Sequence, residues 1–453
     1  MKRIHSIALA IVILFGSAFG VTPPPAGITL IGKGLVPGAA LDKSGLKGNI
    51  CQAGTPDNCV PKALLGGFGS ALAYTGHNNV FIAAPDRGPF DGLTDVPYLD
   101  RIHFFKIETE LNAPFPNISI NLLDTRFLRN ERGQVLVGAA GSFNTDDDNS
   151  RPPFGASWPF RPQKERGDLR FDPEGIRLGL LGTFFVSDEY GPDILEFDIF
   201  GRLLRRLNVP SKYKISNPSK DPNAELLNNM SGRQANRGME GLAISPDNRF
   251  LFGMMQNALI QDNGLEPGDT DRLGLNNRII KIDLITGRKQ EYVYVLDAIN
   301  RGQGTCEILA INDHEFLVLE RDNRSFLAAE PQAPTRKTIY KIDINGATDV
   351  SDVASLPAGA LPPDIAPVQK TLFIDLLDPA FNLAQTIPEK IEGLAWGPDL
   401  RDGRHVLYVI SDNDLNPSLD TQIYAFAIYR SLIHFERQFL PLPVYPPWLI
   451  PRD

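Results

Sequence analysis

The chain is poor in the residues that build zinc sites and thiol chemistry. Its 453 residues include three cysteines and six histidines, with no CxxC motif and no histidine pair at ligand spacing, so a zinc site is not expected. Cys51 and Cys59 lie close together in a loop rich in Gly, Pro and Asn, and outside the cytoplasm they would form a local disulfide. Cys306 lies inside an apolar segment, where we expect a buried, inert thiol.

Long hydrophobic runs are absent beyond the first residues. Lys2 and Arg3 precede an apolar run, Ile7–Phe15, and the mostly small residues GSAFG follow it. This order is typical of a secretory signal peptide, and the run is shorter than the about 20 apolar residues of a transmembrane helix. We therefore predict a signal peptide over residues 1–20, a secreted or periplasmic location, and no stable membrane insertion after cleavage.

Positive charge is also in short supply. The chain has 45 Lys and Arg against 54 Asp and Glu, which gives a formal net charge of −9 at pH 7. Nucleic acids and anionic membranes are bound mainly through Lys and Arg, so neither is an expected partner. A small phosphorylated ligand stays possible because it needs only a few local cations.

Motifs of several common enzyme classes are missing too. The sequence has no GxSxG pentapeptide, which argues against an α/β-hydrolase serine. A phosphate-binding loop would need Ser or Thr after GxxxxGK, whereas Gly34 follows the near match at 27–33. No long segment has the spacing of an amphipathic helix, so helical solenoids are not expected.

A short phrase recurs along the chain. Its copies are SALA at 70–73, PEGI at 173–176, MEGLA at 239–243, CEILA at 306–310 and IEGLA at 391–395. Each copy is followed by an apolar segment that ends in acidic or polar residues, and then by a segment with alternating aromatic and β-branched residues. A fourth, less regular segment completes the unit, and all of these patterns are typical of strands.

Four strands per repeat predict an all-β fold, a β-propeller of four-stranded blades. Five repeats are visible, and the wide gap between Ser70 and Glu174 leaves room for a sixth, so the prediction is five or six blades. Residues 28–34 (ITLIGKG) are expected to add an outer strand to the last blade and close the ring. The predicted regions after the signal peptide are an N-terminal segment with the cysteine loop (21–64), the propeller (65–430) and a Pro-rich tail (431–453). The tail could pack along the barrel side or tether a partner, and we favour packing.

Longer phrases around these repeats resemble one protein family. They are FDPEGI at 171–176, VSDEYGP at 186–192, RGMEGLAISPDNRFLF at 237–252, EILAINDHEFLVLERD at 307–322, YKIDINGATDVSDV at 340–353 and IEGLAWGP at 391–398. Through them the chain resembles the bacterial phytase-like propeller family, often labelled esterase-like activity of phytase. The resemblance implies hydrolysis of a phosphate ester or another ester. Where the family has an acidic residue in the repeat of Glu240, this chain has Gln256 and Asn257.

The innermost strands of a propeller line a central channel, so equivalent positions of the repeats form a ring. Crowded carboxylates repel one another, and Ca²⁺, which takes about six to eight oxygen ligands, offsets that repulsion. The predicted cofactor is therefore a divalent metal, with calcium favoured. The predicted metal ligands are the repeat glutamates, which the sequence register makes equivalent, and two neighbouring aspartates: Glu174, Glu240, Glu307, Glu392, Asp86 and Asp412.

The less repetitive polar residues at the strand ends are the candidates for chemistry. We predict catalytic roles for Asp188, Glu189, Arg321 and Asp322, and binding of substrate phosphate oxygens by Arg87 and Arg324. For each repeated glutamate the alternative is structural, since such residues also accept backbone N–H groups or pair with arginines and lock adjacent blades.

The leading functional hypothesis is a secreted, metal-dependent hydrolase of a small phosphate ester or related ester. One alternative is a non-catalytic propeller whose long loops bind a sugar, a polymer or a protein. A second is a metal-dependent lactonase-type propeller. Because one fold serves many functions, the residues alone leave all three open, including whether the chain is an enzyme.

Overall fold

The computed structural model describes residues 27–138, 169–219, 222–263, 274–297 and 304–441. The predicted signal peptide and the last twelve residues of the Pro-rich tail lie outside these ranges. Within them, α1 (Pro222–Asn228) is the single α-helix, and no helix is long and apolar enough to cross a membrane.

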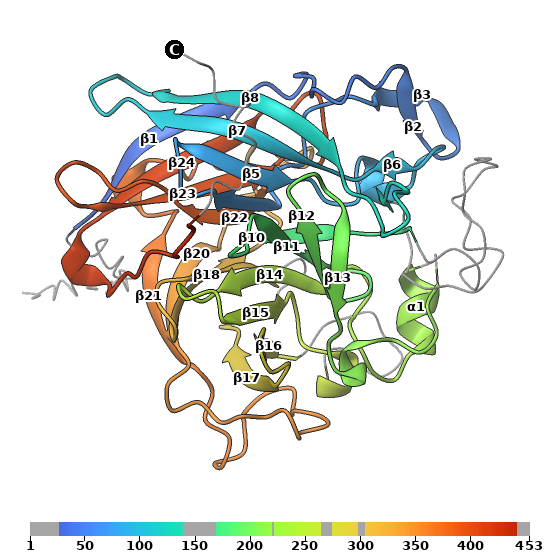
Figure 1. Cartoon of the computed structure of the whole chain (residues 1–453), viewed down its shortest axis with the longest axis vertical. Helices are drawn as coiled ribbons and strands as arrows, with labels where there is room; N and C mark the ends of the chain where they lie inside the picture. The colour runs from blue at the N-terminus through green and yellow to red at the C-terminus, as the bar shows by residue number, and fades with distance from the viewer. Residues whose placement is uncertain (1–26, 139–168, 220–221, 264–273, 298–303, 442–453) are drawn as a thin grey trace, which may run out of the picture.

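Five sheets of four antiparallel strands are arranged around a common centre (Figure 1). From inner to outer strand, the blades are β4 (Ala71–Tyr74), β5 (Val80–Ala84), β7 (Arg101–Thr109) and β8 (Ile118–Phe127); β10 (Pro173–Leu178), β11 (Thr183–Asp188), β12 (Ile194–Asp198) and β13 (Leu203–Leu207); β14 (Met239–Ile244), β15 (Phe250–Met255), β16 (Asn276–Asp283) and β17 (Lys289–Val295); β18 (Gly304–Ala310), β19 (Glu315–Arg321), β20 (Lys337–Asp343) and β21 (Gln369–Asp375); and β22 (Lys390–Trp396), β23 (His405–Asp412), β24 (Thr421–Ile428) and β1 (Ile28–Val36). The predicted propeller of four-stranded blades is confirmed, with five blades in the described part of the chain.

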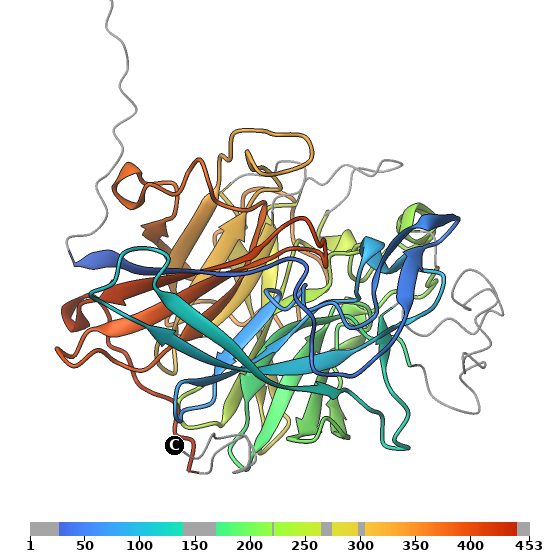
Figure 2. The same ribbon diagram turned by 90° about the horizontal axis from the view of Figure 1, so that it is seen from above.

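The ring is closed by the N-terminal strand. β1 pairs antiparallel with β24, from Ile28 opposite Ile428 to Val36 opposite Thr421, and Figure 2 shows it alongside the strands of the last blade. This confirms the outer strand predicted at 28–34. The N-terminal segment predicted as a separate region therefore supplies part of the propeller.

The core consists of apolar layers between neighbouring blades. Phe81 of β5 packs edge-on against Tyr408 of β23, with ring centroids 5.3 Å apart, and Phe252 of β15 packs against Phe316 of β19 at 4.5 Å. Side chains alternate along a strand, so each blade presents apolar residues to both neighbours. The polar side chains are therefore found mainly at the ends of the strands, outside these apolar layers.

A disulfide hairpin supports the loop that follows β5. Its strands are β2 (Asn49–Gln52) and β3 (Thr55–Pro61), and Cys51 and Cys59 form the predicted disulfide. The Cys51 amide donates to the Asp95 carboxylate at 2.7 Å, and the Asp95 amide donates back to the Cys51 carbonyl at 2.9 Å. The hairpin is thereby fixed against the segment between β5 and a short strand pair, β6 (Tyr98–Leu99) with β9 (Val137–Gly138).

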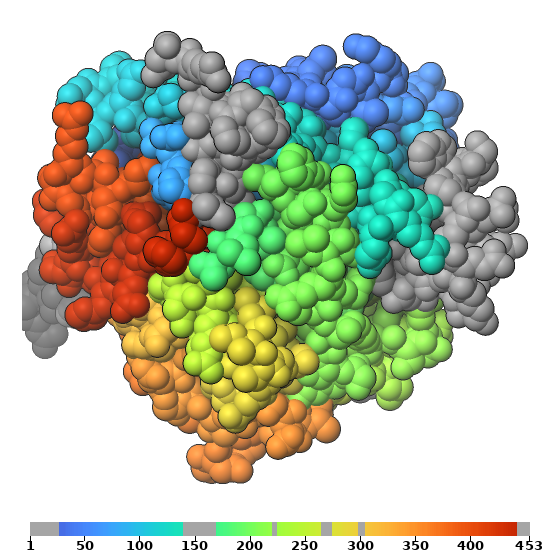
Figure 3. All heavy atoms as spheres, viewed as in Figure 1, coloured from blue at the N-terminus to red at the C-terminus, as the bar shows by residue number. Residues whose placement is uncertain are grey.

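The last described residues cross one mouth of the channel, where the inner strands end. The amide of Gln438 donates to the Leu178 carbonyl at 2.8 Å, and that of Asn248 donates to the Phe439 carbonyl at 2.7 Å. In Figure 3 the end of the described chain, in dark red, lies between the orange-red and green parts of the ring. The described part of the tail therefore packs at this mouth of the propeller, and the prediction for the rest of the Pro-rich tail falls on residues 442–453, outside the described ranges. The opposite mouth holds the candidate site.

Candidate functional site

A cavity of about 270 Å³ lies at the mouth where the inner strands begin. All of its lining side chains are polar or charged, with eight carboxylates and four cations: Asp86, Arg87, Asp91, Glu174, Glu189, Asn236, Arg237, Glu240, Gln256, Arg321, Asn323, Glu389, Lys390, Glu392 and Asp414. Such a surplus of buried negative charge is costly unless protons or cations offset it.

A β-bulge in the inner strand places Glu240 and Glu392 in the lining of this cavity. In the third blade Met239 pairs with Met255 and Gly241 with Met254, so Glu240 has no partner in the ladder. In the last blade Glu392 is left out in the same way. The glycine that follows lets the next inner strand approach, because a Cβ at Gly241 would lie 2.8 Å from the Ile308 amide nitrogen. The recurring Glu-Gly pair thus encodes a bulge and a close strand contact.

Glu307 does not follow this pattern, and its predicted equivalence to the other glutamates is wrong by one residue. In the fourth blade Thr305 pairs with Glu320 and Glu307 with Leu319, so the residue left out of the ladder is Cys306. This repeat has Ile in place of Gly after its glutamate, and Glu307 stands where the other blades have glycine. Cys306, not Glu307, is the counterpart of Glu240.

Glu307 instead joins an ion pair on the channel axis. Its carboxylate lies 2.9 Å from the guanidinium of Arg177, which also donates to the carbonyls of Leu72 at 3.2 Å and Ile308 at 3.0 Å. These contacts connect the inner strands of the first, second and fourth blades. Cys306 is buried and outside any disulfide, as predicted, and burial raises the pKa of its thiol to about 12.

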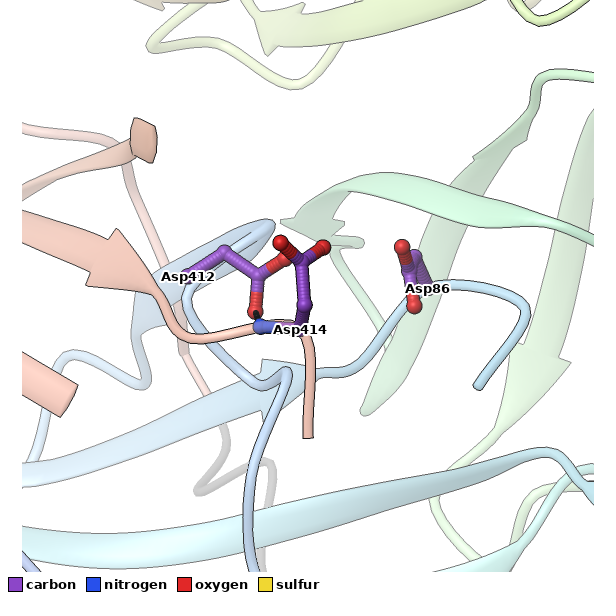
Figure 4. Close-up of side chains that lie close together, drawn as sticks. All are labelled: Asp86, Asp412 and Asp414. Atoms are coloured by element: carbon purple, nitrogen blue, oxygen red, sulfur yellow. Dashed lines mark hydrogen bonds between the residues drawn. The ribbon is translucent and has the colours of Figure 1, made fainter. Parts of the chain in front are cut away.

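Three aspartates from two neighbouring blades form the first carboxylate cluster. One oxygen each of Asp86, Asp412 and Asp414 lies within 4.8 Å of the others, and Figure 4 shows Asp86 after β5, facing the end of β23. Burial raises the pKa of Asp86 to about 6, with Arg87 opposing, and burial with repulsion by Asp414 raises that of Asp412. Among the described residues, the Asp412 Oδ2 is buried without a hydrogen-bond partner, and the Lys390 ammonium lies 4.0 Å away. This ammonium donates to the Asp414 carboxylate of the same cluster.

This cluster fits a hard divalent cation. Its donors are all carboxylate oxygens, which Ca²⁺ and Mg²⁺ prefer, and the unpartnered Asp412 oxygen has a ligand position to offer. Of the residues predicted to bind metal, Asp86 and Asp412 are brought together here.

A second carboxylate cluster is paired with an arginine, as the first is paired with Lys390. One oxygen each of Asp172, Glu174 and Glu189 lies within 4.8 Å of the others, and Arg87 donates to Asp172 at 2.9 Å and to Glu189 at 3.2 Å. Burial and repulsion by Glu240 raise the pKa of Glu174 well above its usual range. Arg87, predicted to bind substrate, is thus engaged by carboxylates.

The remaining cations of the cavity lie near Glu240 and Glu392. Arg321 donates to Glu392 and to Asn323, and Arg237 donates to Gln256. Burial lowers the pKa of the Arg237 guanidinium. The Nε–H groups of Arg237 and Arg321 are buried and have no hydrogen-bond partner in the described chain, so each has a donor to offer to an anion.

Three other predicted residues lie outside the cavity lining. Asp188 accepts the amides of Tyr190 and Gly191, each at 3.1 Å, and burial raises its pKa to about 7. Asp322 accepts the Thr335 amide at 2.7 Å and lies 3.1 Å from Lys337, and Arg324 is exposed. The structure therefore gathers Glu174, Glu189, Glu240, Arg321 and Glu392 with Arg87 and Asp86, and leaves Asp188, Asp322, Arg324 and Glu307 apart.

Sequence reasoning missed six charged residues of the site, among them Asp91 and Glu389. The other four stand at short spacings from predicted residues. Asp172 and Lys390 precede a repeat glutamate by two positions, Asp414 follows Asp412 by two, and Arg237 precedes Glu240 by three. Side chains two apart on a strand share a face, which is the signal that would have found the first three.

Comparisons with known proteins agree with the motifs and the fold. Residues 63–415 match the model of the phytase-like family, described as esterase-like activity of phytase. The chain belongs to this family. A curated relative, an "Uncharacterized secreted protein" of Arthroderma benhamiae, is 28% identical over 412 residues, which cover 76% of this chain and 75% of the relative.

Two solved structures are similar at much lower identity. A calcium-binding protein, regucalcin, from Agrobacterium tumefaciens is 12% identical, with 77% of this chain and 92% of that chain covered and a TM-score of 0.29. A streptogramin B lyase is 13% identical, with 78% and 98% covered and a TM-score of 0.24. At these TM-scores neither likeness adds to the account of the fold or the site.

Proposed function

We propose that this member of the phytase-like family is an exported hydrolase of phosphate esters that depends on a divalent cation, with calcium as the favoured ion. One observation carries the proposal: Asp86 and Asp414 share a cavity with buried arginines whose Nε–H donors have no partner among the described residues. Asp412, which has a buried oxygen without a partner in the same ranges, completes the aspartate cluster from the adjoining cavity. Phosphoryl transfer needs both positive charge and donors for phosphate oxygens.

Each group of side chains has a distinct role in this proposal. Asp86, Asp412 and Asp414 hold the cation, which when bound supplies positive charge and lowers the pKa of a coordinated water. Arg237 and Arg321 bind the phosphate oxygens through their free donors. Burial and repulsion by Glu189 raise the pKa of Glu240 well above its usual range, so this carboxyl stays protonated and is suited to donate a proton to the leaving alcohol.

Export is supported by two observations. The first residues have the order of a signal peptide, and the relative from Arthroderma benhamiae is named as a secreted protein. The disulfide of the β2–β3 hairpin is consistent with an oxidising compartment.

The proposal is tested by initial rates on 4-nitrophenyl phosphate, 4-nitrophenyl acetate and a γ-lactone, with calcium and after chelation. We expect calcium-dependent turnover of the phosphate ester, reduced roughly a hundredfold in Asp414→Asn. The matched control is Asp352→Asn, an exposed aspartate outside the cavity, which should keep wild-type rates.

The other outcomes identify the alternatives. A preference for the lactone or the acetate would replace phosphate-ester hydrolysis by a lactonase or carboxylesterase reaction. Absence of turnover on every substrate, with and without calcium, would favour a binding propeller.

A further inference from the structure

A smaller cavity of about 60 Å³ adjoins the polar cavity. The two share Glu389, Lys390 and Asp414, and Asp412 lines the smaller one as well. Of the three clustered aspartates, Asp414 therefore borders both cavities, while Asp86 lines the polar cavity and Asp412 the smaller one. A group bound at this cluster would have polar walls on one side and the smaller cavity on the other.

The smaller cavity has four apolar residues in its lining, beside polar ones. They are Leu327 and Ala328 between β19 and β20, Pro388 just before β22, and Leu419 between β23 and β24; we call these four residues the apolar groove. Leu327 is 41% exposed and Leu419 is 37% exposed. The polar cavity, by contrast, has no apolar side chain among the described residues that line it. Exposed leucines beside a site gain free energy when a ligand covers them.

Hydrogen bonds hold the groove in shape. The buried Ser325 hydroxyl donates to the Ile387 carbonyl at 2.7 Å, and the Leu327 amide donates to the Ser325 oxygen at 2.9 Å. On the other side, the Asn413 amide donates to the Leu419 carbonyl at 2.7 Å. Both walls are therefore tied to segments that border the aspartate cluster, and a ligand would find the groove preformed.

We infer that the apolar groove binds the alcohol part of the substrate, and that this alcohol carries a short alkyl or aryl group. The inference rests on the proposed function. Hydrolysis joins a water oxygen to phosphorus and releases the alcohol with a proton, so phosphate and alcohol lie on opposite sides of the reacting bond. With the phosphate on Arg237 and Arg321, the alcohol extends past Asp414 into the groove. A polyhydroxylated alcohol would lose water from its hydroxyls against leucine without replacement.

The inference is tested by calorimetric titration of methylphosphonate and hexylphosphonate in the presence of calcium, since neither probe can be hydrolysed. We expect hexylphosphonate to bind about tenfold more tightly, the value for burying roughly two methylene groups. Leu327→Asp and Leu419→Asp should each remove this difference and leave methylphosphonate affinity unchanged. Leu181→Asp, at a 73% exposed leucine in the turn between β10 and β11, is the control and should keep the difference.

The possible failures are distinguishable. If the wild type bound both probes with equal affinity, the assignment of the apolar groove to the alcohol would be wrong, and the proposed function would still stand. If neither probe bound, both the proposed function and this inference would be overturned. A dimer seen by sedimentation and dissociated by Leu327→Asp would assign the groove to a second copy of the chain and also overturn the inference.

Discussion

At the scale of the residue, burial decides the protonation of the cavity. Burial and mutual repulsion raise the pKa values of Asp86, Asp412, Glu174 and Glu240, while Glu392 has a lowered pKa because Arg321 and Lys390 outweigh its burial. Glu392 thus favours its ionised form, whereas the raised pKa values of Asp412, Glu174 and Glu240 favour their protonated forms. A bound divalent cation would replace these protons, which is why we place it at the aspartate cluster.

The buried ion pair between Glu307 and Arg177 leads to a prediction about stability, because Glu307 is a structural residue and not a metal ligand. Glu307→Ala leaves the buried Arg177 without its carboxylate partner and should lower the free energy of unfolding by about 3 kcal/mol. The measurement is urea unfolding of the two single variants and of Arg177→Ala/Glu307→Ala. We expect the double variant to lose less than the sum of the singles. Strict additivity would show that the pair is not coupled.

At the scale of the element, the Glu-Gly pair of the repeat specifies a β-bulge in the inner strand. Aligning the repeats by their letters alone places this bulge wrongly in the fourth blade. The repeated phrase predicted the inner strands correctly, because Glu-Gly followed by apolar residues recurs in three blades. CEILA aligns by its letters with MEGLA, yet the strand shifts by one position because glycine is missing. A shift of one residue turns a side chain to the other face, so Glu307 was predicted in the right strand and on the wrong side.

The closing strand β1 gives the prediction at the element scale. A Cβ at Gly34 would lie 2.8 Å from the Cβ of Ile118 and 3.0 Å from its carbonyl oxygen, both in the first blade. Gly34→Val should therefore strain the seam of the ring and lower the free energy of unfolding by about 2 kcal/mol. Leu35→Val, at a 48% exposed neighbour on the same strand, should change it by less than about 0.5 kcal/mol. If both variants lowered the free energy of unfolding equally in urea, the close contact between β1 and the first blade would not be what limits residue 34.

At the scale of the whole molecule, the sequence predicted the ring but only part of the site. The propeller, its five repeats, the closing strand and the disulfide followed from local patterns. The site did not follow fully, because its residues come together across blades. Asp86 and Asp414 meet only when the first and last blades become neighbours, and Asp188 and Asp322, which end similar strands, turn to nearby backbone amides.

The central claim is that acidic residues far apart in the chain bind one divalent cation at the mouth of the ring. It is tested most directly by calorimetric titration of calcium into the metal-free full chain and into Asp86→Asn/Asp414→Asn, with Asp352→Asn as control. We predict saturable binding to the wild type and the control, weakened at least about tenfold in the double variant because two carboxylate ligands lose their charge. Absence of calcium binding to the wild type, or equal affinity in the double variant, would contradict the account.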